Sequence, residues 1–150
     1  MSTAFTLLCN RALYTEAFDV ITRTVRDDIT FEGRADAWRT ITATSPHRSI
    51  IFTSMVRMRP GDEFSRLVLS LHTFARKIET QAVDTRTRIL ERILGAKLLI
   101  GVFAEPGLSD DAGHLECLAE LCARLDAIIF TREGFVDAGG DLILGVTQRP

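Results

Sequence analysis

The run from Lys97 to Phe103, KLLIGVF, constrains the fold of this chain more than any other feature of the sequence. Successive residues of a strand point to opposite faces of a sheet, so an unbroken apolar run presents apolar side chains to both. This pattern is typical of a central strand that is buried on both faces. We therefore expect a sheet with residues 97–103 near its middle and helices packed on at least one face.

Shorter strand patterns precede this run. Residues 5–9 are apolar, residues 29–33 alternate, and residues 38–44 are rich in threonine. Residues 50–58 give the longest strand signal, with apolar side chains on both faces. The connections between the last three patterns are short, and Pro46 breaks the chain between two of them. This spacing predicts an antiparallel meander over residues 29–58.

Four segments carry apolar residues at helical spacing, namely 15–27, 62–78, 84–94 and 109–125. The spacing is clearest in 62–78, which follows the turn Arg59-Pro60-Gly61-Asp62 and has one apolar stripe. Thr15 and Ser109 stand where N-caps are expected, and Gly95 stands where a helix would end.

The last helical segment lies between two strand patterns, 97–103 and 127–131, which predicts a βαβ unit with a parallel strand pair. A closing hairpin is expected over 135–144. The fold class is thus α+β or two-layer α/β, with a mixed sheet of about six strands and three to four helices. The order is β-α-β-β-β-α-α-β-α-β-hairpin, and the 150 residues form a single domain.

The composition favours a cytoplasmic protein. No segment approaches the roughly 20 apolar residues of a membrane helix, and residues 1–4 lack the basic region of a signal peptide. The chain has three cysteines, Cys9, Cys117 and Cys122, without the spacing of a metal site. We interpret them as buried reduced thiols, and we expect no metal, no cofactor and no membrane partner.

Charge is distributed unevenly along the chain. Basic residues are in excess over residues 1–100 and acidic residues over 101–150, and the net charge is −2. Nucleic-acid binding requires a basic surface, and no aromatic residues are interleaved with the arginines of the middle segment to stack on bases. We therefore expect no nucleic-acid partner, and an ion-paired, solvated face where those arginines cluster.

Glu105 is the best-placed polar residue for chemistry, because it directly follows the central strand pattern. In open α/β sheets, ligands bind beyond the carboxyl ends of the strands. A carboxylate there could act as a general base. The simpler interpretation is a solvated loop carboxylate or a cap on a backbone amide, since such residues are common. None of the common phosphate-binding, metalloprotease or serine-hydrolase motifs is present.

Two histidines are weaker candidates. His72 lies at the border of the apolar stripe of 62–78 and could titrate near neutral pH, although a half-buried histidine with one satisfied hydrogen bond is the simpler interpretation. His114 follows Asp110 by four residues, which fits a surface pair on a helix. The same spacing could supply two metal ligands, but no third ligand is evident.

Trp38, Met55 and Met58 lie within the meander. They are either ordinary core residues or, if the second face of the sheet is open, an exposed apolar patch. An exposed patch of this kind marks a partner or dimer surface. The sequence favours neither interpretation.

The stretch from Lys97 to Leu144 resembles the N-terminal region of a bacterial family of uncharacterised proteins. The resemblance is carried by the turn 104–107, the helix end 123–127 and the hairpin 135–142, with segment 62–66, His72 and Glu79 as further matches. It implies a bacterial α/β domain and no established activity or site residue.

Two functions remain open. The first is a non-catalytic binding or protein-interaction module, most readily a homo-oligomer, which the missing catalytic motifs and the two-sided strand 50–58 favour. The second is a small hydrolase-like enzyme that uses Glu105 with His72 or His114 nearby. We prefer the first function, because functional residues must be identified from geometry, and the sequence supplies none.

Overall fold

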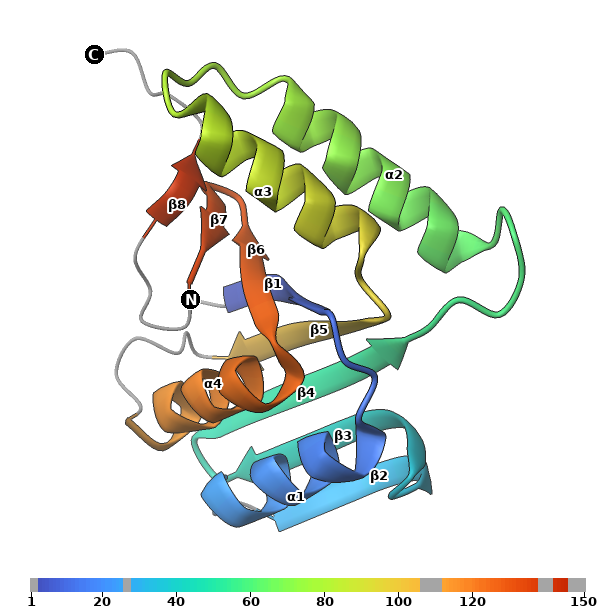
Figure 1. Ribbon diagram of the computed structural model, residues 1–150. Helices are drawn as coiled ribbons and strands as arrows, with labels where there is room; N and C mark the ends of the chain where they lie inside the picture. Colours follow the sequence, from blue (N-terminus) through green and yellow to red (C-terminus); the bar gives the residue numbers. More distant parts are fainter. Residues whose placement is uncertain (1–2, 26–27, 106–111, 138–141, 146–150) are drawn as a thin grey trace.

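The computed structural model describes residues 3–25, 28–105, 112–137 and 142–145 (Figure 1). It has eight strands and four helices in these segments. The strands are β1 (Thr3–Cys9), β2 (Asp28–Arg34), β3 (Ala37–Ser45), β4 (Arg48–Met55), β5 (Leu98–Glu105), β6 (Ala127–Thr131), β7 (Gly134–Val136) and β8 (Leu142–Gly145). The helices are α1 (Tyr14–Thr24), α2 (Glu63–Arg76), α3 (Val83–Leu94) and α4 (Ala112–Leu125).

All eight strands belong to one sheet in the order β2-β3-β4-β5-β1-β6-β7-β8. Every pair of neighbours is antiparallel. The expected order of elements, the meander and the closing hairpin are confirmed. The expected strand number of about six is too low, because both hairpin strands join the same sheet. The expected mixed sheet is wrong, and the class is α+β.

The predicted parallel pair of strands is also wrong, because β1 lies between β5 and β6. Leu7 of β1 is paired with Ile100 of β5 on one side and with Ile129 of β6 on the other. β5 and β6 therefore run in the same direction, but they are not neighbours. The helix α4 crosses over β1, and the first strand of the chain occupies the interior of the sheet.

Alternation along the central strands divides the apolar side chains between two clusters. Leu7 and Cys9 lie in one cluster, whereas Leu8 lies in the other. The first cluster also contains the buried residues of α1 and α4, and the second contains those of α2 and α3. We call these sides of the sheet the α1–α4 face and the α2–α3 face. Helices thus cover both faces, giving three layers where two were expected (Figure 1).

Local signals explain how α2 begins and how α3 ends. Asp62 caps α2 as expected, since its carboxylate accepts a hydrogen bond from the Ser65 amide at 2.9 Å. Gly95 is the C-cap of α3, also as expected. Thr15 is not an N-cap, because α1 begins one residue earlier, after Leu13, without a side-chain cap. Ser109, the expected cap of α4, lies outside the described residues.

The helices α2 and α3 cover only part of their face. Their apolar cluster includes Leu8, Leu99, Ile128 and Phe135, which come from β1, β5, β6 and β7. Farther along the same face, β3 and β4 present threonines, and Thr40 is paired with Thr53. Phe103 of β5 has 40% of its surface exposed. The α2–α3 face therefore has a covered half and an open half.

Candidate functional site

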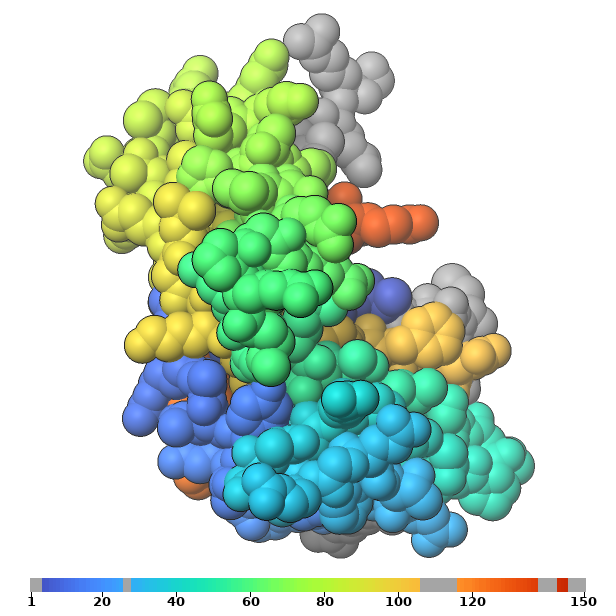
Figure 2. All heavy atoms as spheres, turned by 90° about the vertical axis from the view of Figure 1, so that its right-hand side faces the viewer, coloured from blue at the N-terminus to red at the C-terminus, as the bar shows by residue number. Residues whose placement is uncertain are grey.

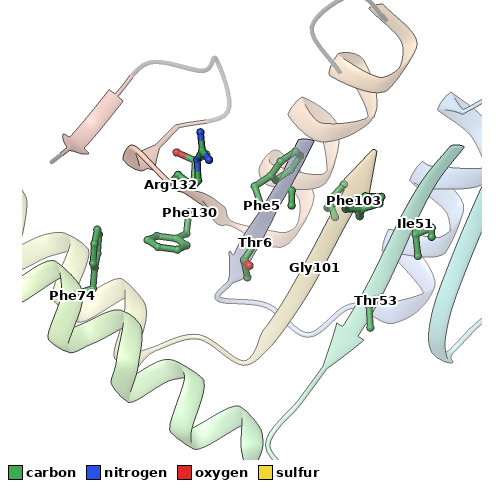
Figure 3. Close-up of a pocket in the computed structure, with 12 residues that line it drawn as sticks. Phe5, Thr6, Ile51, Thr53, Phe74, Gly101, Phe103, Phe130 and Arg132 are labelled. Atoms are coloured by element: carbon green, nitrogen blue, oxygen red, sulfur yellow. The ribbon is translucent and has the colours of Figure 1, made fainter. Parts of the chain in front are cut away.

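An apolar cleft with a volume of about 650 Å³ lies where the covered and open halves of the α2–α3 face meet. Ligand pockets in proteins have volumes of roughly 300–1,000 Å³, so the cleft has the size of a small-molecule site. The lining residues come from β1, β4, α2, β5 and the end of β6 (Figure 3). They are Ala4, Phe5, Thr6, Ile51, Thr53, Phe74, Gly101, Val102, Phe103, Phe130, Thr131 and Arg132.

The floor of the cleft is Gly101, in the middle of β5. Gly101 is paired with Thr6 of β1 on one side and with Thr53 of β4 on the other. A Cβ atom at this position would find its nearest neighbour, the Thr53 carbonyl oxygen, at 3.9 Å. The space above Gly101 is therefore open, and the missing side chain makes a depression between two threonines.

One wall of the cleft is aromatic. The rings of Phe74 on α2 and Phe130 on β6 meet edge to face, with centroids 5.4 Å apart and an interplanar angle of 84°. Phe130 also packs against the fully buried Phe135, at 5.1 Å. Edge-to-face packing fixes the rings relative to one another. This wall is thus held by the hydrophobic cluster beneath α2 and α3.

The opposite side is formed by Ile51 and Phe103, which are paired across β4 and β5. Phe103 belongs to the same face as Gly101, two residues farther along the strand. In Figure 2 the gold atoms of β5 project to the right of and below the green atoms of α2. A bound molecule would lie over Gly101 between the aromatic wall and the Ile51–Phe103 pair.

Arg132 stands on the rim, above Phe130 (Figure 3). It is the first residue of the two-residue turn between β6 and β7, where Thr131 is paired with Gly134. The Thr131 hydroxyl accepts a hydrogen bond from the Glu133 amide at 3.1 Å and donates one to the Gly134 carbonyl at 3.2 Å. The tight turn therefore fixes the backbone that carries the guanidinium group.

The cleft offers apolar surface, one positive charge and the hydroxyls of two threonines, since the third, Thr131, is engaged in the turn. Of the described residues that line the cleft, Arg132 alone has an ionisable side chain. Within the described part of the chain, the hydroxyls of Thr6 and Thr53 have no hydrogen-bond partner, and Arg132 has no ion pair. These groups can contact a ligand, whereas general acid–base catalysis would require a titratable pair within hydrogen-bond reach.

Glu105 is exposed at the end of β5 and is not among the residues that line the cleft. Its two neighbouring strands run opposite to β5, so their carboxyl ends lie at the other edge of the sheet. Glu105 therefore follows the carboxyl end of β5, as expected, but lies beside the amino ends of β1 and β4 and not beside a parallel strand. A catalytic role of Glu105 itself stays a prediction.

His72 comes from another part of the molecule. His72 is half-buried on α2, whose cluster reaches β5 at Leu99. Glu105 is six residues beyond Leu99, which corresponds to about 20 Å of extended strand. No described contact joins Glu105 to His72. The helix α4 includes His114, but the side chain of His114 and its expected partner Asp110 lie outside the described residues.

Trp38, Met55 and Met58 do not form one patch. Trp38 is 1% exposed on the α1–α4 face, where its ring packs against Tyr14 and its indole nitrogen donates to the Tyr14 carbonyl at 3.1 Å. Met55 is partly buried in the α2–α3 cluster, and Met58 is 82% exposed. Both methionines line a second hollow of about 570 Å³ at the beginning of α2.

The three cysteines are free and buried in the α1–α4 cluster, as expected. Burial raises the pKa of Cys117 to about 11 and that of Cys122 to about 12, and it raises the pKa of Cys9 still further. No group of three histidine, cysteine or acidic residues within the described ranges could hold a metal ion.

The cleft was not predicted from the sequence, although one residue signals it. Gly101 interrupts the run KLLIGVF, and a glycine inside a strand often marks a place where another group approaches closely. Whether Gly101 lies in a cleft depends on which part of the face α2 and α3 leave uncovered, and the sequence does not show how the helices pack.

None of the described helices is long and apolar enough to cross a membrane. The described part of the fold is thus a sheet between helices, with one apolar cleft and one arginine at its rim. No family model, curated protein or solved structure matches this chain, so the resemblance to a bacterial family stays a prediction.

Proposed function

We propose that this protein is a non-catalytic binding module, and that the cleft above Gly101 is its binding site for an apolar ligand. The observation that carries the proposal is the open apolar volume beside an ordered aromatic wall. Burying apolar surface contributes about 25 cal/mol per Å² to binding. Phe74, Phe103 and Phe130 supply this surface without a charged group at the floor.

The geometry also supports a site that exists before the ligand binds. Phe130 is held between Phe74 and the buried Phe135, so the wall does not have to be ordered by the ligand. Gly101 is held by its strand pairing to β1 and β4. A preformed site loses less conformational entropy on binding than a flexible one does.

Filling the floor of the cleft tests the proposal. Gly101 has no positive φ and no close neighbour, so a side chain fits there without backbone strain. Binding of the neutral apolar dye Nile red should be measured by fluorescence for the native protein, Gly101→Val and Gly101→Leu. We expect the Kd to rise with side-chain size, by about tenfold or more for leucine, which corresponds to 1.4 kcal/mol.

Thr30→Leu is the matched control, because Thr30 is an exposed residue of the edge strand β2 and does not line the cleft. It adds a similar apolar side chain and should leave the Kd unchanged. Thermal unfolding should show that all variants fold. Absence of dye binding by the native protein, or equal binding by Gly101→Leu, would contradict the proposal.

A second candidate is self-association, which exposed aliphatic side chains on α2 and α3 favour. Leu69, Val83 and Leu94 are exposed by 60%, 53% and 55%. Sedimentation velocity over a wide concentration range tests this candidate, with Leu69→Lys and Leu94→Lys expected to weaken any dimer. A monomer at every concentration would exclude self-association.

A further inference from the structure

We infer that the ligand of the cleft is an amphiphile with an apolar body and a single anionic group, which pairs with Arg132. This inference rests on the proposed binding function and adds the charge and orientation of the ligand. The apolar body would lie over Gly101, and the anionic group would lie at the β6–β7 turn.

Charge at the rim is the first argument. Among the lining residues that the structure describes, Arg132 has the only charged side chain and none is a carboxylate. A cationic head group would find no partner there and would be repelled by the guanidinium group. A carboxylate or phosphate, in contrast, can form charge-assisted hydrogen bonds with the guanidinium nitrogens.

The availability of Arg132 is the second argument. Many of the other arginines are engaged, such as Arg23 with Glu120 at 2.6 Å and Arg92 with Asp126 at 3.1 Å. Arg132 has no ion pair with any residue that the structure describes. Its backbone is nevertheless fixed, because both hydrogen bonds of the Thr131 hydroxyl stabilise the turn. The arginine is therefore positioned but unpaired, as a ligand-binding cation should be.

The polarity of the rest of the cleft is the third argument. Phe74 and Phe130 form an apolar wall beside the arginine, and Thr6 offers a hydroxyl between this wall and the floor. The positive charge thus lies at one end of the cleft, near β6, with one hydroxyl on each side of Gly101, on Thr6 and Thr53. The apolar contacts extend across the floor from the aromatic wall to Phe103. An amphiphile matches this division, whereas a uniformly polar molecule such as a sugar would leave the wall uncovered.

A matched pair of ligands tests the inference. Dodecanoate and dodecanol have the same chain length and differ in charge, and both can be titrated against bound Nile red, below the concentrations at which they aggregate. At pH 8 the carboxylate is ionised. We expect dodecanoate to bind the native protein about fivefold more tightly than dodecanol, as a partly solvated ion pair would give.

Arg132→Gln should abolish this preference by weakening dodecanoate and leaving dodecanol unchanged. Arg34→Gln is the control, because Arg34 lies on the edge strand β2, is paired with Asp36 at 3.2 Å and does not line the cleft. It removes the same charge and should preserve the preference for dodecanoate.

The outcomes separate the inference from the proposed function. If both ligands displace the dye equally and Gly101→Leu blocks both, the cleft binds apolar ligands but the inferred anion preference is wrong. If the native protein binds neither Nile red nor either ligand, the proposed function itself fails. Unchanged selectivity in Arg132→Gln would also overturn the inference, since the anion would then be bound elsewhere.

A membrane lipid shares the chemistry of a free amphiphile, so the source of the ligand needs its own measurement. Phosphatidylcholine vesicles with and without phosphatidylglycerol should be sedimented with the native protein and with Gly101→Leu. We expect no co-sedimentation of either protein, because the inferred ligand is a soluble molecule. Sedimentation with anionic vesicles that Gly101→Leu abolishes would overturn this assignment and identify a lipid surface as the source.

Discussion

Arg92 of α3 holds Asp126, the residue between α4 and β6, by two contacts. One guanidinium nitrogen lies 3.1 Å from the Asp126 carboxylate, and the other donates to the Asp126 carbonyl at 2.8 Å. The Asp126 carbonyl also accepts a hydrogen bond from the Asn10 amide, at 3.1 Å. The contact therefore joins helices that lie on opposite faces of the sheet.

Substitutions of Asp126 should separate the contribution of the ion pair to stability from that of the backbone conformation. Asp126 has φ of 50°, a left-handed conformation that asparagine and glycine tolerate better than alanine does. We expect Asp126→Asn to lower the free energy of unfolding by less than about 1 kcal/mol, because both side chains of the pair are partly exposed to solvent. Asp126→Ala should be about 1 kcal/mol less stable than Asp126→Gly. Urea unfolding measures both differences, and equal stability of the alanine and glycine variants would contradict the conformational argument.

The carboxylate of Asp62 should make stability depend on pH. Hydrogen bonds from the amides of Ser65, Met58 and Arg59 hold the pKa of Asp62 well below its usual range. The lowered pKa of Asp62 stabilises the folded protein at pH values above about 4, the pKa of an aspartate in the unfolded chain. This stabilisation is lost as the pH falls toward the pKa of Asp62 in the folded protein. We expect the Tm difference between the native protein and Asp62→Asn to shrink between about pH 5 and pH 2. A constant difference over this range would show that the charge of Asp62 is not responsible.

Gly134 should tolerate no side chain. Its φ is +132°, and a Cβ atom would lie 2.2 Å from the Leu144 carbonyl oxygen. Gly61 also has a positive φ, +75°, but has open space around it. Gly61→Ala should therefore lower the free energy of unfolding by about 1 kcal/mol, from the backbone conformation alone. Gly134→Ala should lower it by more than about 3 kcal/mol, because backbone strain and the steric clash add. Chemical denaturation provides the comparison, and similar costs for the two variants would exclude the collision.

The cysteines should be unreactive in the folded protein. The thiolate is the reactive form of cysteine, and burial raises the pKa of Cys117 to about 11 and that of Cys122 to about 12. We expect almost no reaction with an aromatic disulfide reagent at pH 8 in buffer and three thiols to react in denaturant. Rapid modification of the native protein would show that the α1–α4 cluster opens readily.

The sequence predicts the elements of this fold better than their pairing. The apolar stripe of residues 62–78 and the cap at Asp62 depend on neighbours within one turn, so both are visible in the sequence. The position of β1 depends on pairing with residues about 90 and 120 positions away, such as Ile100 and Ile129 for Leu7. No local pattern distinguishes this arrangement from a direct β5–β6 pair, which is why the expected parallel pair was wrong.

The residues of the candidate site, like the strand pairing, depend on tertiary structure that local sequence patterns do not show. The sequence indicates Glu105 because of its position after an apolar strand, whereas the proposed binding cleft is lined by Gly101 and Arg132. Gly101 has no side chain to signal a role, and Arg132 is one arginine among many in the sequence. The binding roles proposed for these two residues depend on the part of the sheet that α2 and α3 leave uncovered.

The central position of β1 also affects how the chain can fold during its synthesis. The apolar residues of β1 are synthesised well before both of their partner strands, which follow about 90 and 120 residues later in the chain. At roughly 5–20 residues per second, β1 waits for several seconds before the sheet can close around it. Pairing over such long sequence separations is also slow in the complete chain. Pulsed hydrogen exchange during refolding should therefore protect the β3–β4 hairpin before β1, and a nascent chain lacks the two strands that flank β1 until β5 and β6 have been made.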